Sequence, residues 1–399
     1  MRVGVVVEQM GAEYGGGHTF REEIYRALLR LQGELSQEYV FVVKGSAPDY
    51  LESQSYLSLE VPSPPDLSAR SLLRRIWDKI FPPEPPDLRP RIGEALPAEE
   101  VDFLYFCYPD VITDTGVPVL STIWDLAHRY APYFPELTVG DVRVGRELHF
   151  QKLALHSDLL IVGTERGQNE LTQYFGVDPH RQWKIKHPTP ADALHFTKSD
   201  GEDTRESKEP YFVYPSQYWP HKNHVTLLKA WAELRSETGS PPKLYFTGSN
   251  QGNQEHVRTV LQEMNLEDCV EMTGFLERED LLSLVRDSTA IVFPCLFGPE
   301  NLPPLEAGAL GVPTIIADVP GFREQLGDSA FFIEDPMDPS EWASAVTQLI
   351  NEPDTREHLA AQARERAEDY TVDHFVRELD EHLERFSRIR DLWAKQFQA

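Results

Sequence analysis

Short runs of β-branched and aromatic residues alternate along the chain with longer stretches in which apolar residues recur every three or four positions. This alternation is typical of βα units, in which helices connect parallel strands. The pattern predicts strands at residues 3–7, 39–43, 103–106, 117–123 and 159–162 in the first half, and at 211–214, 244–247, 270–273, 290–293, 314–317 and 330–333 in the second half. We therefore expect an α/β protein with two Rossmann-like domains.

Helical periodicity and local composition indicate where the domains begin and end. Helices are predicted at 19–31 and 142–155, and the pattern is almost continuously helical from residue 355 onward. Residues 199–209 are charged and poor in apolar side chains, which is typical of a solvated linker. We predict a first domain at 1–190, an acidic linker at 191–210, a second domain at 211–375 and a C-terminal helix at 376–399.

Composition narrows the class of protein. At 399 residues the chain exceeds the ~250–300 residues at which one hydrophobic core usually stops growing. The formal net charge of −27 argues against a nucleic-acid binder, because such proteins neutralise phosphates with clustered Lys and Arg. Three scattered cysteines are too few for a disulfide framework and lack zinc-site spacing. Without a signal-peptide pattern or a run of about 20 apolar residues, we expect a cytoplasmic protein.

A proline-rich region at 62–97 contains a short basic segment in an otherwise acidic chain. Residues 70–81 have the apolar and basic spacing of an amphipathic helix, which could contact a membrane surface or an anionic acceptor. The alternative is a surface helix that covers part of the first domain. Such a purely structural helix is the more common case in soluble proteins. A peripheral association with the inner face of a membrane is therefore a hypothesis for this segment.

The segment 297–306, Phe-Gly-Pro-Glu-Asn-Leu-Pro-Pro-Leu-Glu, follows one predicted strand and runs into an apolar helix. Pro303 and Pro304 lack amide donors and suit the first helical positions. Such a turn leaves backbone amides facing the crevice at the carboxyl edge of a sheet, where anions and sugar hydroxyls bind. Glu306 would not hold a phosphate there, but it could bind the two hydroxyls of a ribose. The segment therefore predicts a nucleotide-sugar site.

A glycine-rich turn follows the first predicted strand. Gly15, Gly16 and Gly17 open the next helix, where glycine permits close approach of a ligand to the backbone and the helix start offers amides. The pattern is not the G-x-G-x-x-G dinucleotide fingerprint. A purely structural turn is an equally good interpretation.

Lys222 is the best cationic candidate in the chain. It lies between the strand predicted at 211–214 and the next helix, where it could pair with a diphosphate and supply the positive charge that the composition lacks. Taken alone, Lys222 would more often be a solvated surface residue. The neighbouring His221 and His224 would more often be surface or cap residues than acid-base groups.

Asp125 and His128 follow a predicted strand of the first domain. Their side chains should point toward the carboxyl edge of that sheet, where they could contact an acceptor or a sugar. As isolated residues they would more often be a helix cap and a satisfied histidine. The chain has no Ser-His-Asp nucleophile elbow and no H-E-x-x-H motif, which argues against hydrolases and metalloproteases.

Together these motifs resemble the retaining glycosyltransferases of the GT-B class, family 4, which includes mannosyl- and glucosyltransferases of polysaccharide assembly. The resemblance covers nearly the whole chain and is strongest at 212–336, which includes Gly321-Phe-Arg-Glu324. It implies two facing Rossmann-like domains with the active site between them. It also implies that the donor binds mainly to the second domain and that the C-terminal helix crosses back to the first.

The resemblance also implies roles for particular residues. Glu306 would bind the ribose of the donor and Lys222 its diphosphate, and we rank these two with Asp125 and His128 as the candidate catalytic residues. The remaining donor-binding candidates comprise the turn of the first domain, the position near the base, and the amides that would meet the sugar: Gly16, Gly17, Gln217, Gly274, Phe275, Glu300, Asn301 and Leu302.

Three positions depart from the family pattern. Gly298 stands where the family commonly has a glutamate eight residues before the second one, and Glu300 is close in sequence but out of register. Gln217 replaces an arginine five residues before the lysine, and Trp124 replaces a histidine before Asp125. These departures resemble a bacterial subgroup with similar loops, mannosyltransferase-like, and they leave open whether Glu300 replaces the missing glutamate.

The sequence therefore predicts transfer of a hexose, with mannose as the first guess, from a GDP- or UDP-sugar to a glycan or lipid-linked acceptor. Retention without a carboxylate nucleophile favours front-face attack, which requires no metal and no permanently bound cofactor. Two alternatives remain at this point. One is a non-catalytic nucleotide- or glycan-binding protein of the same fold, and the other is a sugar-nucleotide epimerase.

Overall fold

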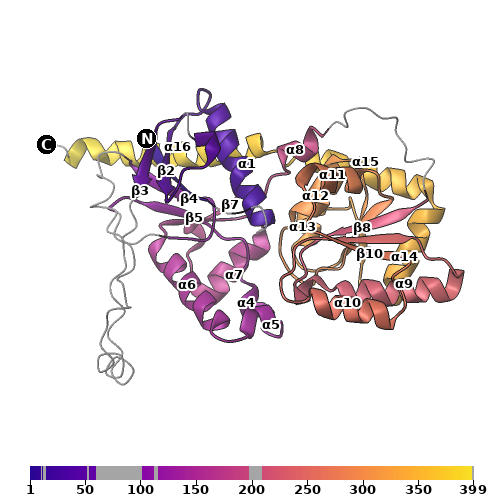
Figure 1. The fold of residues 1–399 in the computed structure, drawn as a ribbon. Coiled ribbons are helices and arrows are strands. Elements are labelled where there is room, and N and C mark those ends of the chain that lie inside the picture. Colours follow the sequence, from indigo (N-terminus) through magenta and orange to yellow (C-terminus); the bar gives the residue numbers. More distant parts are fainter. Residues whose placement is uncertain are drawn as a thin grey trace, which may run out of the picture.

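The computed structural model describes residues 1–9, 11, 15–51, 54–59, 101–111, 116–196 and 209–397. Within these residues the chain forms two parallel sheets, each flanked by helices (Figure 1). The first sheet has the order β3-β2-β1-β4-β5-β6-β7 and the second the order β10-β9-β8-β11-β12-β13. The strands of the first sheet are β1 (Arg2–Glu8), β2 (Glu38–Lys44), β3 (Tyr56–Leu59), β4 (Phe103–Phe106), β5 (Val119–Thr122), β6 (Leu159–Val162) and β7 (Gln182–Lys184).

The second sheet comprises β8 (Tyr211–Pro215), β9 (Lys243–Thr247), β10 (Val270–Gly274), β11 (Ala290–Phe293), β12 (Thr314–Ala317) and β13 (Phe331–Ile333). All strand pairs in both sheets are parallel. The prediction of an α/β protein with two parallel-sheet domains is thus confirmed. The sequence pattern did not predict β3 and β7, which are short strands at the two edges of the first sheet.

Helices connect the strands, as the alternating pattern predicts. The α-helices of the first domain are α1 (Gly16–Leu31), α4 (Ala127–Tyr130), α5 (Pro135–Thr138), α6 (Val142–His156) and α7 (Glu165–Phe175). After α8 (Ala191–Leu194), the second domain contains α9 (His224–Thr238), α10 (Gln254–Glu263), α11 (Arg278–Arg286), α12 (Leu302–Ala309), α13 (Phe322–Leu326), α14 (Pro339–Asn351) and α15 (Pro353–Glu368). Short 3-10 helices lie at Asp49–Leu51, Pro179–Arg181 and Pro220–Lys222.

The last helix, α16 (Val372–Phe397), returns to the first domain and lies along it (Figure 1). Phe375 and Leu379 are buried in the core of the first domain. Asp380, 6% exposed, accepts hydrogen bonds from Ser36 N at 2.7 Å and from Tyr39 Oη at 3.0 Å. The helix is therefore an integral part of the first domain, although it follows the second domain in the sequence.

Two predicted segments lie outside the described residues. These are the basic amphipathic segment 70–81 and most of the acidic linker, at 197–208. No helix among the described residues is long and apolar enough to cross a membrane.

Candidate functional site

The segments that follow the carboxyl ends of β1 and β11 approach each other. Gly16 is the first residue of α1, the helix after β1, and Leu302 is the first residue of α12, the helix after β11. An added β-carbon at Gly16 would lie 3.7 Å from Leu302 Cδ1, so the two domains are in contact at this point. An added β-carbon at Gly17 would lie 3.0 Å from the Trp124 ring, which leaves little room for any side chain there. Glycine at position 17 is therefore favoured by packing within the first domain, whereas the distance at Gly16 is an ordinary van der Waals contact between the domains.

The loop at 297–302 has a conformation that requires glycine at one position. Gly298 has φ +114°, a backbone geometry that other residues rarely adopt. This is the position where the related pattern has its first glutamate. The loop then continues through Asn301, the N-cap of α12, and Pro303 lies in the first helical turn as predicted. A glutamate would be strained in this backbone conformation, so the glycine at position 298 and the conformation of the loop depend on each other.

Lys222 projects toward this loop from the end of its 3-10 helix. Its Nζ donates a hydrogen bond to Asn301 Oδ1 at 3.3 Å and lies 5.3 Å from the centroid of the Phe293 ring. The main chain at Lys222 is fixed as well, because Tyr214 Oη donates to its carbonyl oxygen at 2.7 Å. A half-buried ammonium group is therefore held beside the start of α12, where the sequence predicted a diphosphate contact.

Glu306 is buried on α12 and pairs with an arginine that the sequence did not identify as part of the site. Its Oε1 lies 2.8 Å from Arg278 Nη1, and Arg278 also donates two 2.7 Å hydrogen bonds to Asp192 of α8. Burial opposes the charge of the guanidinium, but the two carboxylates outweigh this effect and raise the pKa of Arg278. The arginine thus holds the predicted ribose-binding carboxylate in a defined place.

A sequence signal could have pointed to Arg278. It is the first residue of α11, where the helix dipole disfavours a positive charge. A cation at that position therefore indicates that nearby carboxylates compensate for it.

Glu300 points away from the second domain and into the first. Its carboxylate accepts a hydrogen bond from His187 N at 2.9 Å, and its Oε2 lies 3.4 Å from His187 Nδ1. The side chain is only 2% exposed and lies against Gly163 at the end of β6. Burial raises the pKa of Glu300 to about 8 and lowers that of His187 to about 3, so both groups favour their neutral forms near pH 7.

A second polar contact between the domains involves His221. Its Nδ1 lies 2.6 Å from Glu136 Oε1 of α5, and its ring is stacked on Phe297 with centroids 3.9 Å apart. Burial opposes ionisation of Glu136, but hydrogen bonds from the His221 ring and amide hold the pKa of that carboxyl below its usual range. His224 lies in the interior of the second domain, stacked on Tyr218 at 4.7 Å.

The first-domain candidates Asp125 and His128 occupy different environments. Asp125 Oδ1 accepts from Ala127 N at 2.9 Å and from Arg146 Nη2 at 2.7 Å, and the residue lines a small pocket that Pro299 of the second domain also borders. His128 is completely buried, with Nε2 3.3 Å from Glu147 Oε2. Asp125 therefore lies at the junction of the domains, whereas His128 lies within the first domain.

The remaining candidates lie around the same junction. Gln217 contacts the glycine turn, since an added β-carbon at Gly15 would be 3.3 Å from its Nε2. Gly274 ends β10 with φ +76° and open space on its side-chain face, and Phe275 is 50% exposed. An exposed ring beside an open backbone position is a suitable surface for stacking a planar base.

The amide of Asn301 already has a partner in this structure. It donates to Gln325 Oε1 at 3.1 Å, and Gln325 Nε2 donates back to Asn301 O at 2.9 Å. The predicted contact between this amide and the donor sugar therefore stays a prediction, because Gln325 occupies the amide in this structure. Gln325 and His187 were both missed by sequence reasoning, and no local pattern marked either of them.

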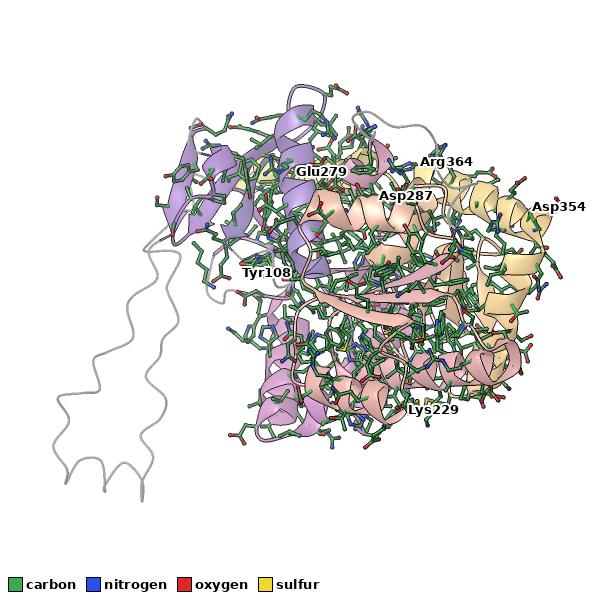
Figure 2. All side chains as sticks on the ribbon, turned by 45° about the vertical axis from the view of Figure 1, so that its right-hand side comes forward. Tyr108, Lys229, Glu279, Asp287, Asp354 and Arg364 are labelled. Carbon is green, nitrogen blue, oxygen red and sulfur yellow. The ribbon has the colours of Figure 1, made fainter. Side chains whose placement is uncertain are left out.

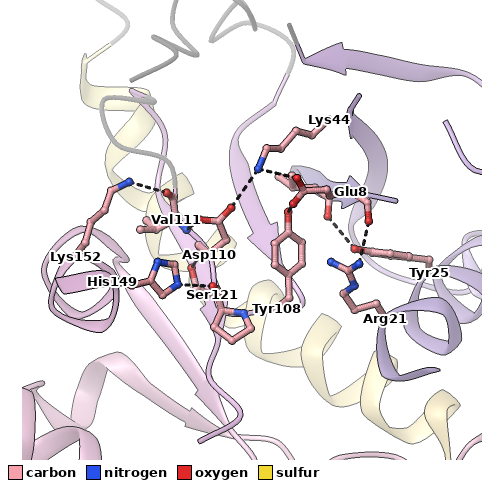
Figure 3. A network of polar contacts seen from close by, with 12 residues as sticks. Glu8, Arg21, Tyr25, Lys44, Tyr108, Asp110, Val111, Ser121, His149 and Lys152 are labelled. Atoms are coloured by element: carbon pink, nitrogen blue, oxygen red, sulfur yellow. Dashed lines mark hydrogen bonds and ion pairs between the residues drawn. The ribbon is translucent and has the colours of Figure 1, made fainter. Parts of the chain in front are cut away.

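The first domain has a network of charged groups at the carboxyl edge of its sheet (Figure 3). Lys44 Nζ lies 3.1 Å from Glu8 Oε1 and 3.6 Å from Asp110 Oδ2, and Tyr108 Oη donates to Glu8 Oε2 at 3.4 Å. These residues lie at the ends of β1 and β2 and just after β4. The side chains of Lys44, Glu8 and Asp110 are between 26% and 39% exposed. β1 and β4 are also the adjacent strands at which the strand order reverses, which is where ligands bind in such sheets.

Comparison with known proteins finds a family model that is similar to part of the chain. Residues 196–366 match the family model described as "Glycosyl transferases group 1". A D-inositol 3-phosphate glycosyltransferase of Rhodococcus erythropolis is 28% identical over 274 residues, which are 65% of this chain and 60% of that protein. The O-antigen chain mannosyltransferase RfbU of Salmonella typhimurium is 28% identical over 153 residues, 38% of this chain and 41% of that protein. The matched part of the chain thus spans 60% or less of the length of these two relatives.

Solved structures share the arrangement of both domains. Anabaena Alr3699/HepE in complex with UDP superposes with a TM-score of 0.68 and 14% identity over 96% of this chain and 100% of that chain. WaaG, a glycosyltransferase involved in lipopolysaccharide biosynthesis, gives a TM-score of 0.67 and 13% identity over 96% and 99% of the two chains. The fold is therefore GT-B, as predicted.

Proposed function

We propose that this chain is a retaining glycosyltransferase that moves a hexose from a nucleoside-diphosphate sugar to a glycan or lipid-linked acceptor. The observation that carries this proposal is the placement of Lys222 beside Asn301, the N-cap of α12, and of Glu306 on α12 itself. One supplies a cation for a diphosphate, and the other a buried carboxylate for a ribose. The match of residues 196–366 to a glycosyltransferase family supports the same activity.

The donor would bind mainly to the second domain. Phe275 would stack near the base beside Gly274, and Glu306 would accept hydrogen bonds from the ribose hydroxyls. Uridine is the first base to test because the related Anabaena structure was solved with UDP and with UDP-glucose. Mannose is the first sugar to test because one relative is a mannosyltransferase.

The proposed reaction is a front-face substitution at the anomeric carbon. The bond from that carbon to the diphosphate oxygen breaks, the acceptor hydroxyl oxygen forms its bond on the same face, and its proton passes to the departing diphosphate. Lys222 would stabilise the negative charge that develops on the diphosphate. The remaining contribution would be the alignment of the two substrates. No step in this scheme uses a metal ion.

The acceptor would approach from the first domain. At the carboxyl edge of the first sheet lies the network of Glu8, Lys44, Tyr108 and Asp110. It offers hydrogen-bond donors and hydrogen-bond acceptors, and it contains both positively and negatively charged groups. Mixed groups of this kind suit the hydroxyls of a sugar better than a purely anionic or purely apolar ligand. The polar groups at this edge are therefore suited to binding the hydroxyls of a glycan acceptor.

The test is transfer and donor hydrolysis by Lys222→Ala, after a thermal-shift screen of nucleotide sugars has identified the donor. We expect kcat to fall by about 10²- to 10³-fold, the usual effect of removing one group that stabilises transition-state charge. Lys229→Ala is the matched control, because Lys229 lies on the outer surface of α9, away from the first domain (Figure 2).

Three outcomes would contradict the proposal. Near-normal transfer by Lys222→Ala would exclude the assigned role of the lysine. Binding of nucleotide without any release of sugar from the donor, with or without acceptor, would favour a non-catalytic binding protein. Conversion of the donor into an isomeric nucleotide sugar would favour an epimerase.

A further inference from the structure

Asn301 uses both its main-chain and its side-chain polar groups for contacts within the second domain. Its side-chain Oδ1 accepts from Lys222 Nζ at 3.3 Å, and its Nδ2 donates to Gly298 O at 3.2 Å. Its main-chain N donates to Gln325 Oε1 at 3.1 Å, and its main-chain O accepts from Gln325 Nε2 at 2.9 Å. Asn301 therefore connects the candidate diphosphate lysine, the glycine of the loop and α13.

Gln325 is itself held firmly. It is 2% exposed, and its carbonyl oxygen accepts from Arg366 Nε at 2.8 Å. Arg366 of α15 also donates through Nη2 to Glu324 O at 2.8 Å and to Tyr370 Oη at 2.7 Å. The amide group of Gln325 thus projects from a fixed backbone onto the main chain of Asn301.

We propose that Gln325 is a positioning residue for the transfer reaction, which fixes Lys222 through Asn301. The proposal rests on the proposed function, in which Lys222 stabilises the leaving diphosphate. Gln325 does not touch Lys222 directly in any of the contacts described. Its effect passes through the main chain of Asn301, whose side chain carries the oxygen that orients the ammonium group.

The chemistry of the side chain explains why an amide serves here. The two contacts with Asn301 require one donor and one acceptor at the end of the same side chain. Glutamine provides both, whereas an ionised glutamate only accepts and methionine has no donor and only a weakly accepting sulfur. A buried main-chain carbonyl or amide that loses its partner costs free energy, so the loop would shift to find another partner. A shift of about 1 Å at the reacting groups can reduce a rate about 10²-fold.

The experiment is a double-mutant cycle with Gln325→Met and Lys222→Ala. Methionine has a similar length and keeps the buried volume, so the change removes the two hydrogen bonds with little loss of packing. Both kcat for transfer and the Kd of UDP, or of GDP if the donor screen identifies a guanosine donor, are measured for the wild type, the two single variants and the double variant. Gln348→Met, on the exposed face of α14, is the matched control.

We expect Gln325→Met to lower kcat by about 10- to 100-fold with little change in the KM for donor, since it acts on alignment. In the Lys222→Ala background the same substitution should have almost no further effect on kcat or on nucleotide affinity. Asn301→Ala, which removes the oxygen that accepts from Lys222, should reproduce the kcat loss even if the Gln325 variant folds poorly.

The inference is overturned if the effects of Gln325→Met and Lys222→Ala multiply independently, because a purely structural role would act equally in both backgrounds. It is also overturned if Asn301→Ala keeps normal kcat. Loss of transfer in Lys222→Ala together with normal transfer in Gln325→Met would leave the proposed function intact and remove only this inference. Normal transfer in Lys222→Ala would remove both.

Discussion

The carboxylate of Glu300 occupies the space that a β-carbon would fill at Gly163 in the other domain. An ideal β-carbon at Gly163 would lie 1.4 Å from Glu300 Oε2, far inside van der Waals contact. The loop that is proposed to hold the donor is therefore anchored on the first domain, and this anchor depends on a glycine. The contact links the position of the loop to the relative placement of the two domains.

Gly163→Ala should expel the Glu300 side chain from its place. We expect weaker contact between the domains and a larger radius of gyration without ligand, measured by small-angle X-ray scattering, and a lower melting temperature. Gly145→Ala is the control, because that glycine lies in α6 with no positive φ and with open space around it. An unchanged radius and melting temperature in Gly163→Ala would contradict the anchoring role.

Stability should depend on pH through Glu300. Burial raises its pKa to about 8 from an ordinary value of 4.5; Glu324 adds to the rise, while the His187 amide and Lys186 oppose it. A carboxyl whose pKa is raised in the native state stabilises that state fully below 4.5, and the contribution is lost as the pH rises toward about 8. The neighbouring His187, with a pKa of about 3, affects stability only below its ordinary value of 6.5.

The measurement is the melting temperature of the wild type and of Glu300→Gln between pH 6.5 and 8.5, a range that avoids the titration of His187. Glutamine keeps an acceptor for His187 N but does not titrate. The wild type should lose stability relative to the variant as the pH rises. Parallel curves for the two proteins would show that Glu300 does not titrate as the geometry implies.

Removing the partner of Glu306 should destabilise the second domain and weaken donor binding. Arg278→Met leaves a carboxylate with 9% exposure without its cation, whereas the arginine itself is 33% exposed. We expect a loss of about 1–3 kcal/mol in the free energy of unfolding, between the ranges for exposed and buried pairs. Urea denaturation measures this loss, and calorimetry measures the Kd of the nucleotide.

The control for this variant is Arg258→Met, since Arg258 forms a pair with Glu255 in which both side chains are exposed. Its stability should stay close to that of the wild type. Equal losses in the free energy of unfolding for the two variants would mean that the Arg278–Glu306 pair contributes no more than an exposed ion pair.

Asp380 should be the main polar anchor of α16 on the first domain. Asp380→Ala removes the acceptor for the main-chain amide of Ser36 and for the hydroxyls of Ser36 and Tyr39. We expect a loss of about 1–3 kcal/mol, measured by urea denaturation. Asp373→Ala, which affects an exposed pair with Arg30, should cost much less.

The positions of Lys222 and Glu306 could be predicted from the sequence because they follow from local rules. A buried parallel strand, a bend and a helix start occupy a few consecutive residues, and apolar periodicity with proline at the first helical turn marks each of them. The two-sheet fold follows from the same repeated pattern. These features depend on neighbours in the chain, which the sequence displays directly.

Tertiary structure alone decided the contacts between distant segments. Arg278 forms ion pairs with Glu306 and Asp192. Glu300 packs against Gly163 of the first domain, and Gln325 forms hydrogen bonds with the main chain of Asn301. Each contact joins residues from separate βα units, so it depends on how helices and loops pack rather than on local propensity. The sequence by itself determined most of the elements, without the short strands β3 and β7, and the edge at which the candidate site lies. Packing determined which side chains meet there.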